Sequence, residues 1–155
     1  MGAEVTLFTR SPGKEEDAHR LGADRVVIST DAAQMAQVAG HFHLIVDTVP
    51  YVHDLNAYIP TLRFKGSLVL VGYLGPLEPA LDSMPMVIGG KAVAASMIGG
   101  MAATQEMLDF CGQHDIVSDV EVIAIQDIND AYERMLKSDV KYRFVIDMAS
   151  LKVEA

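Results

Sequence analysis

Short hydrophobic runs alternate along the first hundred residues with stretches in which hydrophobic residues recur every three or four positions. Several of the runs are continuous in Val, Ile and Leu, which is typical of strands buried on both faces of a parallel sheet. The strands predicted from these runs are residues 4–9, 25–29, 42–49, 67–72 and 92–98. The helices predicted between them are residues 12–21, 32–38 and 54–62. Strands and helices that alternate in this way predict a doubly wound α/β sheet.

The first predicted helix has signals at both ends. Ser11 is suited to the N-cap, Pro12 to the first helical position, and the acidic residues 15–17 to the positive end of the helix dipole. Gly22 can adopt the left-handed conformation that ends a helix. Residues 74–85 contain a glycine and several prolines, and they are predicted to form a loop.

The pattern changes after Gly99 and Gly100. A helix over residues 101–114, a strand over 120–125, a helix over 127–137 and a strand over 142–147 are predicted there. Apolar faces are expected on the two helices, at Met107, Leu108 and Cys111 and at Ile128, Ala131, Tyr132, Met135 and Leu136. We therefore expect residues 100–155 to form a C-terminal α+β segment that is separate from the α/β sheet of residues 1–99.

A turn rich in positive charge and hydroxyl groups follows the first predicted strand. It contains Thr9, Arg10, Ser11 and Lys14. In a dinucleotide-binding unit, the second strand ends beside the adenosine ribose, and an acidic residue there binds the hydroxyls of NAD. A guanidinium, an ammonium, hydroxyls and the N–H groups of a helix start favour a 2′-phosphate instead. The alternative is that Arg10 and Lys14 are solvated surface charges and Ser11 is only a helix cap.

Net charge and cysteine content narrow the functional classes. The formal net charge of −9 at pH 7 argues against nucleic acid or an anionic membrane as a partner. Cys111 is the only cysteine, so an internal disulfide cannot form, and we expect a reducing, cytoplasmic location. No run approaches the roughly 18 apolar residues of a membrane helix, and we find no signal-peptide pattern.

Four segments of the second half of the chain form a familiar set. They are Ser96–Gly100, Thr104–Phe110, Ile128–Leu136 and Asp139–Asp147. Together they resemble the C-terminal half of the zinc-dependent medium-chain alcohol dehydrogenases, of the NADP-dependent cinnamyl alcohol dehydrogenase type. The likeness extends over nearly the whole chain. It implies a partial Rossmann-like parallel sheet that lacks its first strand and Gly-rich turn, and it implies NADP(H) as the cofactor.

The resemblance also assigns cofactor contacts to residues that follow predicted strands. It implies that the 2′-phosphate contacts Thr9, Arg10, Ser11 and Lys14, and that the path from adenosine to nicotinamide passes Thr48 and Val49. It implies that the nicotinamide ribose lies beside Val71, Gly72 and Tyr73, and that the carboxamide is held by the backbone of Ser96, Met97 and Ile98. The pyrophosphate contact is implied for Arg143. As alternatives, Thr48 and Ser96 satisfy backbone groups in turns, and Val71 belongs to the core.

The resemblance places the zinc in a catalytic domain that is missing from this chain. Such enzymes bind the reactive zinc through two cysteines, a histidine and a glutamate, and a second zinc through four cysteines, whereas this chain has one cysteine. We therefore expect no catalytic residue and no metal ligand here. His41 and His43 have a spacing compatible with a metal, but structural or surface roles are favoured because no third ligand is in view. His53 is expected at an exposed or capping position.

The function expected from the resemblance is that of a part of an enzyme. The complete protein interconverts primary alcohols and aldehydes by hydride transfer with NADP(H), while zinc polarises the substrate oxygen. This chain supplies the partial NADP-binding domain, residues 1–99, and a segment, residues 100–155, that returns to the catalytic domain. It is expected to be inactive in isolation. The alternatives are a non-catalytic module that binds NADPH or an adenosine 2′-phosphate, and an oligomerising fragment without a ligand.

The missing strand has a physical consequence. In the usual strand order it lies at the centre of the sheet, so its absence opens a gap between two apolar strand edges. Unpaired edges invite pairing with another chain. In the resembled family, the strand predicted at 92–98 is also an outer edge that pairs with its twin. We therefore expect a homodimer or a strand-swapped oligomer, unless the chain is part of a longer protein that fills the gap.

We predict that the isolated chain self-associates. Sedimentation velocity over a dilution series should show species larger than a monomer, with a distribution that shifts with concentration, because association covers open strand edges. A single stable monomer at all concentrations would contradict this prediction.

Overall fold

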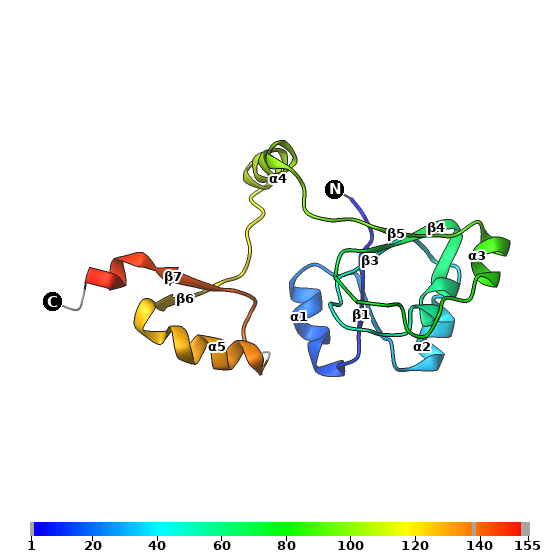
Figure 1. Cartoon of the computed structure of the whole chain (residues 1–155), viewed down its shortest axis with the longest axis horizontal. Coiled ribbons are helices and arrows are strands. Elements are labelled where there is room, and N and C mark those ends of the chain that lie inside the picture. Colours follow the sequence, from blue (N-terminus) through cyan, green and yellow to red (C-terminus); the bar gives the residue numbers. More distant parts are fainter. Residues whose placement is uncertain (1, 138, 153–155) are drawn as a thin grey trace. The chain divides into compact units, whose positions relative to one another are not determined.

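A computed structural model describes residues 2–137 and 139–152 of the chain. The chain divides into two compact units, unit 1 from Met1 to Ile98 and unit 2 from Gly99 to Ala155 (Figure 1). This division lies beside the boundary expected at residue 100. Within the described ranges, no helix has both the length and the hydropathy that crossing a membrane requires.

Unit 1 alternates short strands with helical segments, as the hydrophobic pattern predicted. Its elements are β1 (Thr6–Thr9), η1 (Pro12–Lys14), α1 (Glu15–Arg20), β2 (Arg25–Ile28), α2 (Ala32–Gln37), β3 (Phe42–Asp47), η2 (Leu55–Ala57), η3 (Ile59–Thr61), β4 (Leu62–Leu70), α3 (Met84–Gly89) and β5 (Ala92–Ala95). The first predicted helix is present as a 3-10 turn followed by α1. Gly22, with a φ of +97°, takes the left-handed conformation expected beyond its end.

Parallel pairing joins these strands into two sheets. β1 pairs with β2, with Thr6 opposite Arg25. β4 lies between β3 and β5, so that Ser67 has Leu44 on one side and Ala92 on the other. Among the described residues, no strand connects β1 to β3. The parallel α/β class is therefore confirmed, and the sheet is interrupted where the missing strand was expected.

The core of unit 1 is formed by Ile45, Ile59, Leu62 and Leu68, which are at most 8% exposed. Burial of one such side chain stabilises the fold by about 1.5–3 kcal/mol. The partly buried residues packed against this cluster are Phe8, Phe42, Tyr58, Leu70, Met86 and Val93. Because Phe8 belongs to β1, the core links the two sheets even though their strands are not paired.

The helix predicted over residues 54–62 is wrong. The structure has two 3-10 turns there, η2 and η3. Pro60 lies in the first turn of η3, and since proline has no N–H, it does not continue an α-helix from the preceding turn. Asp54 caps η2 through its carboxylate, which accepts a 2.9 Å hydrogen bond from the N–H of Asn56. Leu62 then already begins β4, which is longer than predicted.

The loop predicted over residues 74–85 extends in the structure only to Ser83. Its last two residues open α3, and Pro85 lies in the first turn of this helix. A proline is tolerated there because the first N–H groups of a helix have no intrahelical acceptor. The prolines that suggested a longer loop therefore had two different roles.

Unit 2 contains the elements predicted for the second part of the chain. They are α4 (Met101–Gln113), β6 (Glu121–Ala124), η4 (Ile125–Asp127), α5 (Ile128–Leu136), β7 (Phe144–Asp147) and η5 (Met148–Lys152). β6 and β7 form a parallel pair. The expected apolar faces of the helices are covered only in part. Ala131 of α5 is buried, but Tyr132, Met135 and Leu136 are exposed, and α4 has no buried residue.

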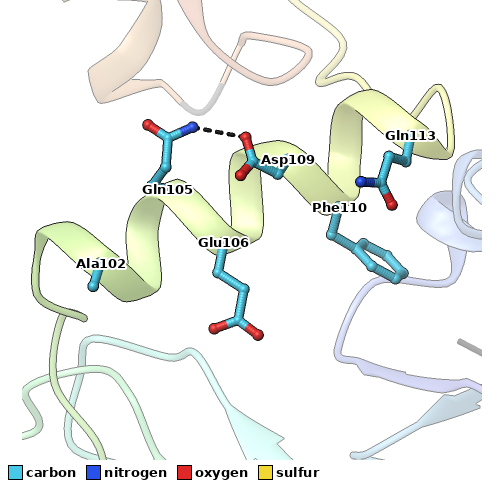
Figure 2. A pocket seen from close by; sticks show the side chains of 6 residues that line it. All are labelled: Ala102, Gln105, Glu106, Asp109, Phe110 and Gln113. Atoms are coloured by element: carbon cyan, nitrogen blue, oxygen red, sulfur yellow. Dashed lines mark hydrogen bonds between the residues drawn. The ribbon is translucent and has the colours of Figure 1, made fainter.

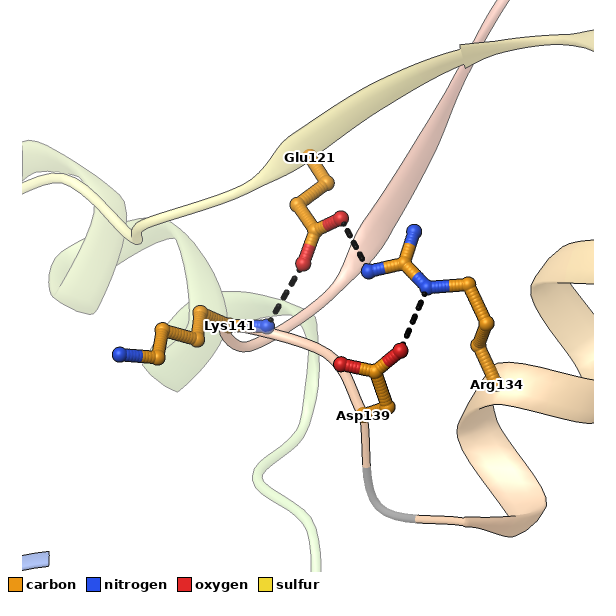
Figure 3. A network of polar contacts seen from close by, with 4 residues as sticks. All are labelled: Glu121, Arg134, Asp139 and Lys141. Atoms are coloured by element: carbon orange, nitrogen blue, oxygen red, sulfur yellow. Dashed lines mark hydrogen bonds and ion pairs between the residues drawn. The ribbon is translucent and has the colours of Figure 1, made fainter.

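A polar network joins the end of α5 to the β6–β7 pair in unit 2 (Figure 3). The carboxylate of Glu121 accepts hydrogen bonds from the backbone N–H of Lys141 at 2.9 Å and from the Arg134 guanidinium at 2.7 Å. Arg134 also donates to Asp139 at 3.0 Å, and its guanidinium lies 4.8 Å from the centre of the Phe144 ring. The Lys141 N–H, followed by Arg134, holds the pKa of the Glu121 carboxyl below its ordinary value.

Replacing Arg134 with methionine should raise the pKa of Glu121 and destabilise unit 2 at neutral pH. Because the pKa of Glu121 is lowered in the folded state, its contribution is present above its unfolded pKa and is lost as pH falls through the folded value. The difference in thermal midpoint between the wild type and Arg134→Met should therefore shrink below a pH of about 4. Lys152→Met removes an equal charge outside this network and serves as the control. A pH-independent difference would contradict the role of Glu121.

Candidate cofactor site

The carboxyl ends of β3, β4 and β5 form a continuous edge of one sheet. The carbonyl of Asp47 accepts a 2.9 Å hydrogen bond from the N–H of Val71, and the carbonyl of Leu70 accepts one of the same length from Ser96. These bonds extend both ladders beyond the strands and hold the three ends in line. Thr48, Val71 and Ser96 therefore follow neighbouring strands, at the edge where ligands bind in parallel α/β sheets.

Gly72, in the turn after β4, lies against the segment that follows β3. A Cβ atom at this position would be 2.7 Å from the carbonyl oxygen of Val49 and 3.3 Å from the Cα of Pro50. Since these are backbone atoms, they cannot rotate out of the way as a side chain could. Glycine therefore permits the turn after β4 to pass directly over the segment that follows β3, leaving Tyr73 exposed beside it.

A carboxylate and an imidazole brace the segment after β3. Asp47 is 8% exposed, and its carboxylate accepts a 2.9 Å hydrogen bond from the N–H of Val49. Its other oxygen lies 2.9 Å from Nε2 of His53, while Nδ1 of His53 lies 2.8 Å from the carbonyl oxygen of Tyr51. The ring thus bridges the strand end and the following loop.

The exposed or capping position expected for His53 is wrong, because its side chain is only 22% exposed and pairs with Asp47. The pair was not predicted from the sequence, because the two residues lie six positions apart and meet only after the chain turns at the end of β3. The available signal was an aspartate at the end of a buried apolar run, which needs a partner when it is buried.

The basic turn after β1 presents its side chains to solvent. Arg10, Ser11 and Lys14 are exposed, and neither cationic side chain has a hydrogen bond or ion pair with another described residue. The Ser11 hydroxyl makes no capping hydrogen bond, so its expected role as a cap is not seen. The Ser11 N–H donates instead to Oγ1 of Thr9 at 3.1 Å, which tightens the turn. Two cations and a hydroxyl are therefore close together in sequence and available to an anion.

The residues expected near the nicotinamide are also exposed. Val71 is 47% exposed, so the alternative that it belongs to the core is wrong. Met97 and Ile98 are at least 90% exposed, directly after the end of β5. Thr48 is exposed beside the end of β3, and the Ser96 hydroxyl is 3.4 Å from the carbonyl of Met97, at the limit of a hydrogen bond.

The residues expected to contact the cofactor are divided between the two units. Those from Thr9 to Ile98 lie in unit 1, where they follow β1, β3, β4 and β5. Arg143 lies in unit 2 immediately before β7, and its carbonyl accepts a 2.8 Å hydrogen bond from the N–H of Glu121. Its contact with the pyrophosphate therefore stays a prediction, as do the individual roles of the residues in unit 1.

Two other places in the chain carry polar or ring side chains. His43 contacts Arg63, and His41 packs edge-to-face on Phe42, with 5.0 Å between the ring centres. In the described part of the chain, no group of three or more potential ligands is arranged to hold a metal ion. A hollow beside α4 is lined by Ala102, Gln105, Glu106, Asp109, Phe110 and Gln113 (Figure 2). Because all six belong to one helix, this feature is a helix face and not an enclosed site.

The parallel strands, the crossover helices and the aligned strand ends define a doubly wound α/β protein of the Rossmann-like class. The chain belongs to the zinc-binding dehydrogenase family, whose sequence model matches residues 1–113. This family membership and the similarities below confirm the resemblance to the C-terminal part of zinc-dependent alcohol dehydrogenases.

The chain spans about two fifths of the length of the relatives described next. A probable cinnamyl alcohol dehydrogenase 9 of Oryza sativa subsp. japonica is 50% identical over 99% of this chain, which spans 42% of that protein. A structure of a cinnamyl alcohol dehydrogenase from Sorghum bicolor matches 96% of this chain and 42% of its own, with 43% identity and a TM-score of 0.88. The Helicobacter pylori cinnamyl alcohol dehydrogenase complexed with NADP(H) matches the same shares, with 35% identity and a TM-score of 0.79.

Replacing Gly72 with alanine should destabilise unit 1 by about 1–3 kcal/mol, because the new methyl group overlaps backbone atoms. Gly13→Ala is the matched control, since a Cβ there would meet no atom within 4 Å; its effect should stay within about 0.5 kcal/mol. Urea unfolding followed by circular dichroism measures both. Equal stabilities of the two variants would show that the turn after β4 can move away from Val49 at little cost.

Proposed function

We propose that this chain is the nucleotide-binding portion of an NADP(H)-dependent, zinc-dependent alcohol dehydrogenase that interconverts primary alcohols and aldehydes. Membership of the dehydrogenase family supports the reaction class. The single observation that carries the choice of cofactor is the pair of cations in the turn at the end of β1, Arg10 and Lys14, which have no partner among the described residues.

The chemistry of this turn fits a phosphorylated ribose. A guanidinium offers a planar pair of donors to phosphate oxygens, and a lysine adds a mobile positive charge. Glu15 is the first acidic residue after the strand, so no carboxylate at the strand end repels a phosphate. The solved relative from Helicobacter pylori, complexed with NADP(H), lends further support.

The remaining contacts follow the aligned strand ends. We assign Thr48 and Val49 to the path of the cofactor, the turn Val71–Tyr73 to the nicotinamide ribose, and the backbone of Ser96–Ile98 to the carboxamide. Arg143 would reach the pyrophosphate. When bound, the nicotinamide accepts or donates the hydride. The role of this chain is to hold and orient the cofactor, with Gly72 allowing the turn to lie close to the neighbouring strand end.

Activation of the substrate by zinc is assigned to a different part of the enzyme. The resembled zinc sites need two and four cysteines, and this chain has only Cys111. The activation of the substrate oxygen therefore lies outside the chain, and the chain alone is inactive. We also propose a cytoplasmic location, which suits a single free cysteine.

A homodimer contact is proposed at the outer edge of β5. This strand is the last of its sheet, so one side of its backbone is open to pairing. Val87 and Ile88 of α3, which precedes β5, are 76% and 72% exposed and supply apolar surface that an interface can cover.

Fluorescence titration with NADPH and NADH tests the cofactor assignment. The chain should bind NADPH more tightly, and Arg10→Gln should weaken NADPH binding by roughly tenfold to a hundredfold, because a hydrogen bond to a charged group is worth about 1.5–3 kcal/mol. NADH binding should change little. Arg10→Asp should abolish the preference for NADPH, since a carboxylate repels the phosphate.

Arg20→Gln is the matched control, because it removes the same charge from the end of α1 without altering the turn. A preference for NADPH that survives in Arg10→Asp would exclude Arg10 as its source. Equal and negligible binding of both cofactors would favour a ligand-free oligomer. Binding without any activity after addition of the missing part of the enzyme would favour a non-catalytic nucleotide module.

A further inference from the structure

Ser11 lies in a run of exposed residues after β1. Every residue from Arg10 to Glu16 is exposed to solvent. The Ser11 hydroxyl makes no capping hydrogen bond and has no other partner among the described residues, although the Ser11 N–H donates to Oγ1 of Thr9. A Cβ at Gly13 would meet no atom within 4 Å, so the space beside the turn is open. The hydroxyl is therefore free and accessible to another protein.

The backbone around this hydroxyl is extended before a short turn. Ser11 has φ and ψ angles of −112° and 109°, a conformation that Pro12 favours because its ring crowds a helical residue before it. The following 3-10 turn is closed by a 3.1 Å hydrogen bond from the Lys14 N–H to the Ser11 carbonyl. Because an exposed turn of this kind opens locally at little cost, the segment can lie extended in the cleft of a modifying enzyme.

The proline after Ser11 distinguishes it from the other hydroxyl residues. Ser11 is the only serine or threonine of the chain that a proline directly follows. Proline has no backbone N–H, so a pocket without an acceptor at this position accepts proline and rejects residues whose N–H would be buried unpaired. Kinases that modify serines followed by proline select in this way, and the charge pattern of the substrate adds to the selection. Here Pro12 supplies the missing N–H and Lys14 supplies a cation.

Two cations lie close to this hydroxyl in the sequence. Arg10 directly precedes Ser11, and Lys14 ends the following 3-10 turn; neither has a partner among the described residues. A phosphoserine carries a charge of about −1.5 to −2 at pH 7 and three strong acceptor oxygens, and beside such cations it forms charge-assisted hydrogen bonds. The nearest acidic residues that follow, Glu15 and Glu16, are exposed, so water and salt screen their repulsion of a phosphate.

We propose that Ser11 is a phosphorylation site for a proline-directed serine/threonine kinase, and that its phosphate occupies Arg10 and Lys14 in place of the 2′-phosphate of NADP(H). In the kinase reaction, Oγ of Ser11 attacks the γ-phosphorus of ATP, the bond from this phosphorus to ADP breaks, and the hydroxyl proton passes to a carboxylate of the kinase. The modified chain binds NADP(H) weakly, because one phosphate fills the site and repels the other. The modification itself depends only on the exposed turn, whereas its effect on the cofactor rests on the proposed function.

Mass spectrometry after treatment with a kinase tests the modification. The complete chain is incubated with a purified cyclin-dependent kinase, Mg²⁺ and ATP, and one phosphate should appear on Ser11. Ser11→Ala should remove it. Pro12→Ala, which keeps the hydroxyl but restores a backbone N–H, should slow the reaction by roughly tenfold or more. Circular dichroism confirms that both variants fold. No phosphate on Ser11, or an unchanged rate in Pro12→Ala, would overturn the proposal.

The position of the phosphate can be tested by ³¹P NMR without any cofactor. Arg10 and Lys14 favour the dianion of a phosphoserine, so they lower the pH at which its second proton is lost, whereas Glu15 and Glu16 raise it. Arg10→Gln should therefore raise this pH in the phosphorylated chain. Arg20→Gln, which removes the same charge from the end of α1, should leave it unchanged. Equal values in the two variants would show that Arg10 does not hold the phosphate.

NADPH titration tests the effect on the cofactor. A chain translated with phosphoserine in place of Ser11 should have a Kd for NADPH roughly tenfold or more above that of the unmodified chain. The Kd for NADH should change much less, because NADH has no 2′-phosphate. An equal Kd for NADPH in both chains would overturn the exclusion of the cofactor. An unmodified chain without a preference for NADPH would contradict the proposed function, while the kinase and NMR results would still decide the modification and the place of its phosphate.

Discussion

Backbone pairing between parallel strands is the constraint on which the rest of unit 1 depends. Among its described strands, only β4 has a partner on both edges, and it also contributes Leu62 and Leu68 to the core. The carboxyl end of β4 is consequently well positioned, with hydrogen bonds from Val71 to β3 and from Ser96 to β4. β1 belongs to a separate two-stranded sheet, and its basic turn is placed by that pair and by the packing of Phe8.

The proposed cofactor site therefore consists of two parts with different support. The edge formed by β3, β4 and β5 is braced by backbone hydrogen bonds, by the close approach at Gly72 and by the Asp47–His53 pair. The turn after β1 supplies positive charge but has no ladder to that edge.

The basic turn after β1 carries positive charge in a chain that is negatively charged as a whole. The chain carries a net charge of −9, yet Arg10 and Lys14 have no acidic partner in the described part. Arg134 shows the opposite arrangement in unit 2, where Glu121 and Asp139 surround the guanidinium and Phe144 lies beneath it. Paired cations stabilise local structure, whereas cations left unpaired beside a strand end are available for an anionic ligand.

Sequence alone determined the order of the strands, the α/β class and the family, because continuous apolar runs and caps such as Gly22 are local signals. It also indicated the basic turn and a break in the sheet. Tertiary structure decided the rest. It pairs Asp47 with His53, six residues away, and it leaves Val71 exposed. These features depend on which groups meet in space, and in a sheet whose strands are distant in sequence, hydrophobic periodicity does not contain that information.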